Sequence, residues 1–178
     1  MCPGCGRGFD SFEGLPEEDA GVGLKEHSLT GWLYGKGKFS SSWLYNSGSP
    51  EATAAAILKG LADQHGVTAT RMVVGYYNKT LTSELLPQLK PAVYVDIDCD
   101  LYNSTIDCLD FLLKHRLIVT GTLIGYDDWA LGGHELGEYG ESRAHAEMCA
   151  KYDMECTPLI EWNGAKQMVF RVDRVGTR

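Results

Sequence analysis

Acidic side chains follow two short apolar segments of the sequence at positions where a metal ion could bind. Asp98 and Asp100 come directly after the first segment, and Asp127 and Asp128 come directly after the second. The carboxyl ends of neighbouring parallel strands are where open α/β sheets bind ligands. Carboxylates crowded at such an edge would repel one another, and a hard cation such as Mg²⁺, Mn²⁺ or Ca²⁺ would offset this repulsion. The alternative is that each acid lies on a solvated loop.

The segments before these acids have the composition of buried strands. Residues 92–97 form an apolar run after Pro91, which predicts a strand covered on both faces. Residues 121–126 predict a second strand. Ser104 and Thr105 are candidate caps for a helix that ends near residue 113.

The rest of the chain predicts an α/β fold with the order β-α-β-α-β-α-β-β. The expected sheet is mainly parallel, with an antiparallel hairpin at its C-terminal end, and we expect residues 1–178 to form a single domain. The other expected elements are a helix from Ser49-Pro50 to Gly66, a strand over 70–77, a short helix over 83–89, a helix over 138–152, and hairpin strands over 154–162 and 167–172.

Composition excludes several classes of protein. The 178 residues are 44% hydrophobic and 22% charged, which is typical of a globular protein with a core. The net charge of −8, without a basic tract, argues against a nucleic-acid partner. The sequence has no apolar run of membrane-spanning length and no signal-peptide pattern, so the expected location is the cytoplasm and no membrane partner is expected.

The six cysteines are expected to be free thiols, because a core-rich chain of this length does not need disulfides. Cys2 and Cys5 form a C-x-x-C pair at the start of the chain, where neither a redox helix nor a second zinc-ligand pair accompanies it. Residues 18–49 are rich in glycine, serine and aromatics and predict a long irregular segment, whose aromatics could line a pocket or cover the core.

Four motifs, in order along nearly the whole chain, resemble the macrocin O-methyltransferase family. They are GFDSFEGLP at 8–16, GKFS at 37–40, IDCDLYNST at 97–105 and DDW at 127–129. The resemblance implies a class I, Rossmann-like fold that binds S-adenosylmethionine and Mg²⁺, or another hard divalent cation. It also implies methylation of a hydroxyl on a sugar or other small natural product, so the expected partner is a small-molecule acceptor.

The resemblance also assigns the metal site, and it leaves the general base open. Asp98 matches the first metal-binding aspartate, and Asp127 and Asp128 match the acidic pair that completes the site. A metal held there would bind two substrate oxygens and favour the alkoxide. Asp98 therefore has a catalytic role, and Asp100 and His134 are the candidates for the general base.

The same resemblance places the cofactor on an earlier part of the chain. Asp10 matches the acid that ends the family's second strand, where a carboxylate can accept hydrogen bonds from the ribose. Ser11 lies beside it. Gly75 and Tyr76 match the end of the next strand, near the adenine.

The sequence departs from the family pattern at its start. The family's first strand, glycine-rich turn and first helix precede the segment that matches Asp10, and here too few residues precede it. The first βα unit is therefore expected to be missing, either by truncation or because the chain is a remnant. The sheet edge left open could pair with a second copy in a homo-oligomer. Asp96 also stands where the family often has histidine.

The sequence is also compatible with two alternatives. In one, Asp98-Cys99-Asp100 is the D-x-D motif of a metal-dependent glycosyltransferase, although this does not explain Asp127 and Asp128. In the other, the chain is a non-catalytic or truncated methyltransferase fragment that keeps the sheet and the metal.

Overall fold

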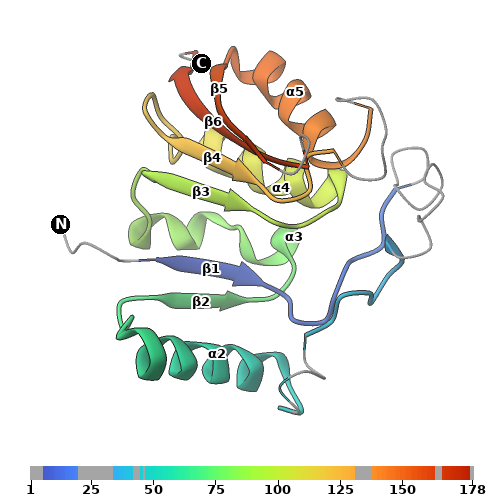
Figure 1. Ribbon diagram of the computed structural model, residues 1–178, viewed down its shortest axis with the longest axis vertical. Helices are drawn as coiled ribbons and strands as arrows, with labels where there is room; N and C mark the ends of the chain where they lie inside the picture. The colour runs from blue at the N-terminus through green and yellow to red at the C-terminus, as the bar shows by residue number, and fades with distance from the viewer. Residues whose placement is uncertain are drawn as a thin grey trace. The chain divides into compact units, whose positions relative to one another are not determined.

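In the computed structural model, the chain is a mixed α/β protein whose contacts divide it into two compact units (Figure 1). The first unit is made of Met1–Pro16 and Lys36–Thr80, and the second of Glu17–Gly35 and Leu81–Arg178. The structure describes residues 6–19, 34–41, 45, 47–130, 138–162 and 166–176. Cys2, Cys5, His134, most of the 18–49 segment and the turn of the C-terminal hairpin lie outside the described residues.

The first unit is built on a parallel strand pair. β1 (Arg7–Asp10) pairs with β2 (Arg71–Val74), and α2 (Pro50–His65) lies between them in the sequence (Figure 1). A short helix, α3 (Tyr77–Thr80), follows β2. The strand expected over residues 70–77 therefore ends early, at Gly75, whose φ of +131° is far outside the range of a strand.

The ends of α2 are as the sequence predicts. Ser49 is the N-cap, and its side chain accepts a hydrogen bond from the Ala52 backbone N–H at 3.2 Å. Pro50 stands at the first helical position, where its missing N–H is not needed. Gly66 ends the helix in the left-handed conformation, and its N–H donates to the Ala62 carbonyl.

Two of the sequence motifs meet in the first unit. The Leu15 N–H donates to the Lys38 carbonyl at 2.8 Å, and the Gly37 N–H donates to the Leu15 carbonyl at 2.9 Å. At Gly14, with φ +86°, a Cβ atom would lie 2.3 Å from the Lys38 carbonyl oxygen. The Ser40 hydroxyl also donates to the Phe12 carbonyl. The close approach of these two segments therefore requires glycine at position 14.

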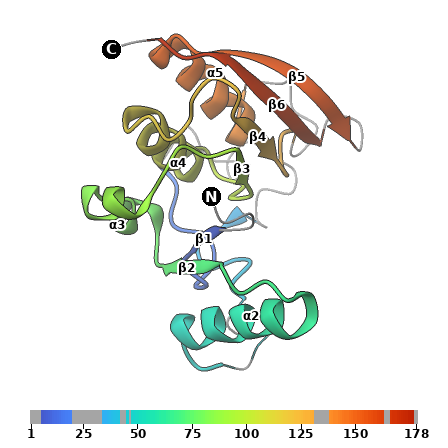
Figure 2. The ribbon, with the colours of Figure 1, turned by 90° about the vertical axis from the view of Figure 1, so that its left-hand side faces the viewer.

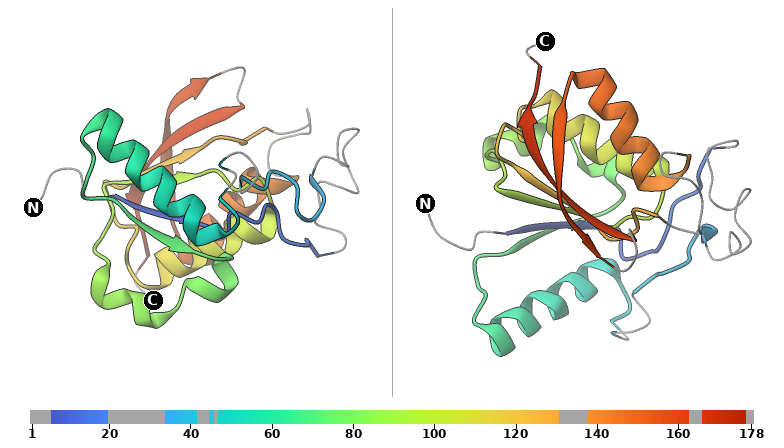
Figure 3. Two further views of the ribbon diagram at one scale, coloured as in Figure 1. Left: turned by 90° about the horizontal axis from the view of Figure 1, so that it is seen from below. Right: turned by 45° about the horizontal axis from the view of Figure 1, so that its top comes forward.

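The second unit contains a four-stranded sheet in the order β3-β4-β6-β5. β3 (Tyr94–Ile97) and β4 (Leu123–Tyr126) are parallel, whereas β6 (Gln167–Arg174) is antiparallel to both β4 and β5 (Glu155–Trp162). Figure 3 shows β5 and β6 as a long twisted ribbon. A 3₁₀ helix, η2 (Ser83–Gln88), precedes β3.

The expectation of one mainly parallel sheet needs correction. The described strands form a parallel pair in the first unit and a mixed sheet in the second. The hairpin itself is confirmed, but its second strand lies beside β4 and its first strand lies at the edge. The burial of the side chains gives the reason, because β6 carries Phe170 and Val172 into the core, whereas Leu159, Ile160 and Trp162 of β5 are exposed.

Two helices cover one face of this sheet. α4 (Tyr102–Lys114) and α5 (Gly140–Tyr152) lie side by side on the same face (Figure 2). The expected cap at Ser104 and Thr105 is wrong, because α4 begins earlier and its N-cap, Leu101, makes no side-chain hydrogen bond. Thr105 instead donates its hydroxyl to the Leu101 carbonyl at 2.9 Å.

The apolar sequence of β3 predicts a strand covered on both faces, but one face of β3 is exposed. Tyr94 and the preceding Val93 are 50% and 80% exposed. Asp96 also lies on the exposed side, where it accepts a hydrogen bond from the Tyr94 hydroxyl at 2.8 Å. Ile97, at the end of the strand, is the residue of β3 that reaches the core. Among the described residues, no helix is both long and apolar enough to cross a membrane.

The close contact at Gly14 gives a first prediction. Gly14→Ala should lower the free energy of unfolding by roughly 1–3 kcal/mol more than Gly37→Ala does, because the added methyl group meets the Lys38 carbonyl. Gly37 is a matched control, since its φ is +76° but nothing lies within 4 Å of its Cβ position. Urea unfolding of both variants measures the difference, and equal losses would contradict the role of the contact.

Candidate metal centre

Three carboxylates meet at the carboxyl ends of two neighbouring parallel strands. Asp98 directly follows β3, and Asp127 and Asp128 directly follow β4. Strands β3 and β4 pair in register up to Ile97 and Tyr126, so both loops leave the sheet at the same level. One oxygen atom from each of the three aspartates lies within 4.8 Å of the others. The structure thus brings together the three residues that the sequence predicts as metal ligands.

The donor set fits a hard divalent cation. All three donors are carboxylate oxygens. In Mg²⁺ sites, neighbouring ligand oxygens lie roughly 3 Å apart, so the three aspartates would have to move only slightly closer together to bind the ion. Asp98 and Asp127 are exposed and Asp128 is half-buried, which leaves room for substrate or water oxygens. The Gln167 side-chain amide at the start of β6 donates to Asp127 and so orients its carboxylate.

Asp100 lies beside Asp128, and we call Asp98, Asp100, Asp127 and Asp128 together the acidic edge. The environment of Asp100 differs from that of the other three. The Leu101 N–H donates to the Cys99 carbonyl at 2.5 Å, and this tight turn holds Asp100 at a φ of +57°. Burial, followed by the charge of Asp128 and a hydrogen bond with it, raises the pKa of Asp100 to about 8. In the absence of a cation, Asp100 therefore keeps its proton at neutral pH and shares it with Asp128.

A fourth acid, Glu141, holds the two loops in place. It lies at the start of α5 and is fully buried. One of its oxygens accepts the Cys99 N–H at 3.2 Å, and the other accepts the Asp128 N–H at 3.1 Å. Burial raises the pKa of Glu141 well above its ordinary value, while these two hydrogen bonds favour the carboxylate. A single side chain thus links the ends of both strands to α5.

Sequence reasoning missed Glu141, although a signal was present. Along α5, Glu141 is three residues before Ala144 and seven before Met148, and all three are buried on one helical face. An acid within an apolar stripe is rarely buried without partners. Glu141 could therefore have been identified as a residue with a specific internal role, but not its two partners.

Tyr34 is a second residue that the sequence did not single out for the site. It comes from the aromatic-rich segment and lies in the same unit as the acidic edge. Burial raises the pKa of Tyr34, and the charges of Asp100 and Asp128 act in the same direction. The Glu18 side chain of the same segment accepts the Asn103 N–H at the start of α4.

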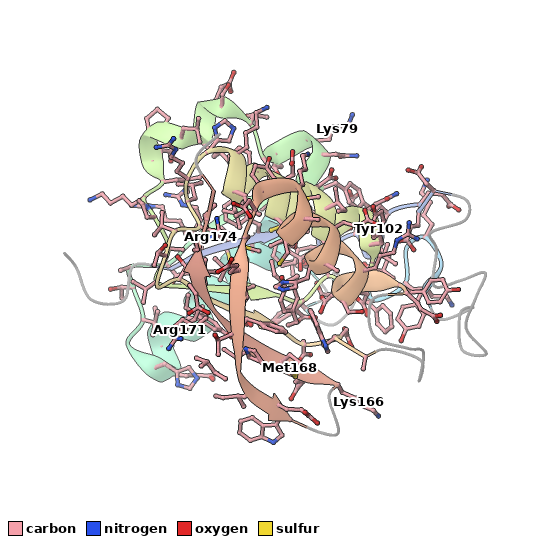
Figure 4. The ribbon with its side chains drawn as sticks, turned by 90° about the horizontal axis from the view of Figure 1, so that it is seen from above. Lys79, Tyr102, Lys166, Met168, Arg171 and Arg174 are labelled. Atoms are coloured by element: carbon pink, nitrogen blue, oxygen red, sulfur yellow. The ribbon has the colours of Figure 1, made fainter. Side chains whose placement is uncertain are left out.

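The start of α4 is fixed by its contacts with α5, and Figure 4 labels Tyr102, the first residue of α4. The Tyr102 hydroxyl donates to Glu147 at 2.5 Å, and the Arg143 guanidinium both pairs with Glu147 at 2.9 Å and lies over the Tyr102 ring. These contacts hold the helix that follows the Asp98 loop. Figure 4 also labels Met168, whose register partner on β4 is Tyr126, the residue before Asp127.

The predicted cofactor residues lie in the first unit. β1 and β2 pair in parallel up to Asp10 and Val74, and the Gly75 N–H donates to the Asp10 carbonyl at 2.9 Å. Asp10 is exposed, and one of its carboxylate oxygens accepts the Phe12 N–H at 2.6 Å. This hydrogen bond orients the carboxylate at the edge of the sheet.

Ser11, Gly75 and Tyr76 differ in what they can offer a ligand. The Ser11 hydroxyl is buried and already used in a turn, because it donates to the Gly14 carbonyl and accepts the Glu13 N–H. Gly75 and Tyr76 follow β2 directly, and the Tyr76 carbonyl begins α3 by accepting the Lys79 and Thr80 N–H groups. Of the four residues predicted to bind the cofactor, Asp10 is therefore the one with an exposed and oriented carboxylate.

The internal role of Glu141 gives a second prediction. Glu141→Gln should lower the free energy of unfolding by roughly 1–3 kcal/mol, because the new NH₂ group faces one of the two backbone donors and leaves it unpaired. The exposed Glu138 provides the matched control Glu138→Gln, which should change stability by less than about 0.5 kcal/mol. Urea unfolding tests both, and similar losses in the two variants would exclude a special role for Glu141.

The raised pKa of Asp100 gives a third prediction. Between about pH 4 and pH 8 the unfolded chain loses the Asp100 proton and the folded chain keeps it, so folding stability falls as pH rises through this window, by at most about 1.4 kcal/mol per pH unit. Asp100→Asn should therefore stabilise the metal-free protein at pH 8 and weaken its pH dependence. Urea unfolding in a chelator at pH 5 and pH 8 measures this. The exposed Asp63→Asn is the control, and an unchanged pH profile in Asp100→Asn would contradict the assignment.

Comparison with known proteins adds a structural likeness. No protein-family model and no curated protein matches the chain. Among solved structures, it is similar to the apo structure of a TDP-rhamnose 3'-O-methyltransferase, an enzyme in calicheamicin biosynthesis, with 16% sequence identity and a TM-score of 0.48. The match covers 93% of this chain and 57% of that one, so the chain spans little more than half the length of the protein it matches.

Proposed function

We propose that this chain is an S-adenosylmethionine-dependent and divalent-metal-dependent O-methyltransferase, acting on a hydroxyl of a sugar or other small natural product. The observation that carries the proposal is the meeting of Asp98, Asp127 and Asp128 at the ends of adjacent parallel strands. The motifs around these residues, which resemble the macrocin O-methyltransferase family, agree with it.

In this proposal the acidic edge binds and orients the acceptor. Asp98, Asp127 and Asp128 would hold Mg²⁺ or another hard divalent cation, which supplies Lewis acidity that favours ionisation of the acceptor hydroxyl. Glu141 contributes by keeping the two loops at a fixed separation, and Gln167 orients Asp127. Methyl transfer needs little further covalent chemistry, so positioning provides most of what the protein contributes.

Asp100 is the described residue best suited to accept the hydroxyl proton. It lies beside Asp128, and its pKa of about 8 in the cation-free protein means that it holds a proton readily. A cation bound at the neighbouring acids would lower this pKa and leave Asp100 ready to take up a proton. His134 stays the other candidate for this role.

The cofactor is assigned to the first unit. The Asp10 carboxylate, oriented by the Phe12 N–H, would accept hydrogen bonds from the ribose hydroxyls of S-adenosylmethionine. Gly75 and Tyr76 lie at the same edge of the β1–β2 pair and would contact the adenine. When bound, the cofactor supplies the methyl group on its sulfonium.

A fourth prediction tests the metal site and the cofactor site separately. Calorimetric titration should show one Mn²⁺ per chain, with affinity at least about tenfold lower in Asp127→Asn, because one of three charged ligands is lost. S-adenosylhomocysteine should bind the parent and bind at least about tenfold more weakly to Asp10→Asn, which loses a charged acceptor. Asp63→Asn, exposed and distant in sequence from both sites, is the control for both titrations.

The outcomes separate the proposal from its alternatives. Binding of a nucleotide-sugar with Mn²⁺, and no binding of S-adenosylhomocysteine, would favour the hypothesis of a D-x-D glycosyltransferase and contradict methyl transfer. Mn²⁺ binding without either ligand would favour a non-catalytic fragment. If Mn²⁺ bound equally well to Asp127→Asn, the assigned metal site would be wrong.

A further inference from the structure

A second cluster of metal-ligating side chains lies on the helical face of the four-stranded sheet. His145 and Cys149 are one helical turn apart on α5, and Cys156 lies on β5, the next strand of the chain. The Cys149 sulfur is 3.3 Å from the His145 Nε2 atom. One ligand atom from each of the three residues lies within 4.8 Å of the others. The acidic edge does not include any of them.

The His145 ring is oriented so that Nε2 faces the sulfur atoms. Its other nitrogen, Nδ1, is 2.9 Å from the hydroxyl of the buried Tyr126. When Nδ1 carries the proton and donates it to this hydroxyl, Nε2 presents its lone pair on the side of Cys149. Metal-binding histidines in proteins have this arrangement, in which an outer partner fixes the tautomer and the ring plane.

Aromatic rings hold the imidazole in place. The Phe170 ring stacks on His145 with centroids 4.7 Å apart, and the Trp129 ring meets it edge-on at 5.2 Å. His145 is only 7% exposed, whereas Cys149 and Cys156 are half-buried. The imidazole is therefore rigid, and the side with the thiols is the one open to an incoming ion.

We propose that His145, Cys149 and Cys156 form a binding site for a thiophilic cation such as Zn²⁺, with a fourth position left for water or another ligand. In a tetrahedral zinc site, sulfur and nitrogen donors lie roughly 3.5–3.8 Å apart. The Cys149 sulfur and His145 Nε2 are 3.3 Å apart and all three ligand atoms lie within 4.8 Å, so small shifts of the side chains would reach this geometry. Binding releases the two thiol protons to solvent and leaves the imidazole neutral.

This site and the acidic edge would select different metals. Two thiolates and an imidazole favour Zn²⁺ or another thiophilic ion, whereas three carboxylates favour Mg²⁺ or Mn²⁺. The inference therefore does not depend on the proposed methyl transfer. A bound ion would also join α5 to β5 close to the turn between them, where Asp153 has a left-handed conformation.

A fifth prediction uses Co²⁺ as the probe, because thiolate–cobalt charge transfer and tetrahedral d–d absorption report sulfur ligands directly. The parent for this test is full-length Cys2→Ser/Cys5→Ser protein, since that C-x-x-C pair could itself bind metal. Reduced, free of oxygen and in excess Mg²⁺ to occupy the three aspartates, this parent should bind one Co²⁺ with both absorption features, and Zn²⁺ should displace it.

Matched variants identify the ligands. Cys149→Ser and Cys156→Ser should each lose the charge-transfer absorption and weaken Co²⁺ binding at least about tenfold. Cys108→Ser, which removes a partly buried thiol outside the cluster, should keep both, as should Asp127→Asn, which alters the acidic edge. Circular dichroism of each variant establishes that it is folded.

The proposal is overturned if the folded, reduced parent shows no sulfur-to-cobalt absorption, or if that absorption survives in both cluster variants. It is also overturned if the reduced parent takes up no metal while mild oxidation lowers the mass by two hydrogens through a Cys149–Cys156 bond. That result would identify a redox pair in place of a metal site.

Discussion

The acidic edge depends on a buried carboxylate that accepts two backbone N–H groups from different loops. Glu141 is removed from water, which raises its pKa, and both of its oxygens take a backbone N–H as hydrogen-bond partner. Its two partners, Cys99 and Asp128, follow different strands and are therefore held at one separation. The positions of the aspartates around them result from this link between the strand ends and α5.

Local sequence patterns were sufficient to predict the elements that carry the site. The ends of α2 are determined by Ser49, Pro50 and Gly66 through contacts within a few residues, so both ends of the helix could be predicted from the sequence. The meeting of Asp98 with Asp127 and Asp128 could be predicted because strand direction and strand order decide it. The roles of these residues as ligands stay predictions, and so does the cofactor role of Asp10.

Features that depend on contacts between distant segments could not be predicted. β6 lies between β4 and β5, and its Phe170 and Val172 are buried in the core. Both strands of the hairpin have apolar residues, so the sequence alone does not show which strand lies beside β4. The two partners of Glu141 are 42 and 13 residues away in the chain. At Tyr94 the prediction was wrong, because the apolar run around it predicted a buried strand face and that face is exposed.

The position of β6 has a consequence for how the sheet assembles during synthesis. β4 carries Asp127 at its end, and its antiparallel partner is a strand made more than forty residues later, as in the pairing of Leu123 with Arg171. A ribosome making this chain therefore releases β3 and β4 well before β6, the second neighbour of β4, exists. Until then, one side of β4 exposes its N–H and C=O groups, the kind of edge that chaperones protect from aggregation. The acidic edge is thus completed late, when β6 pairs and brings Gln167 to Asp127.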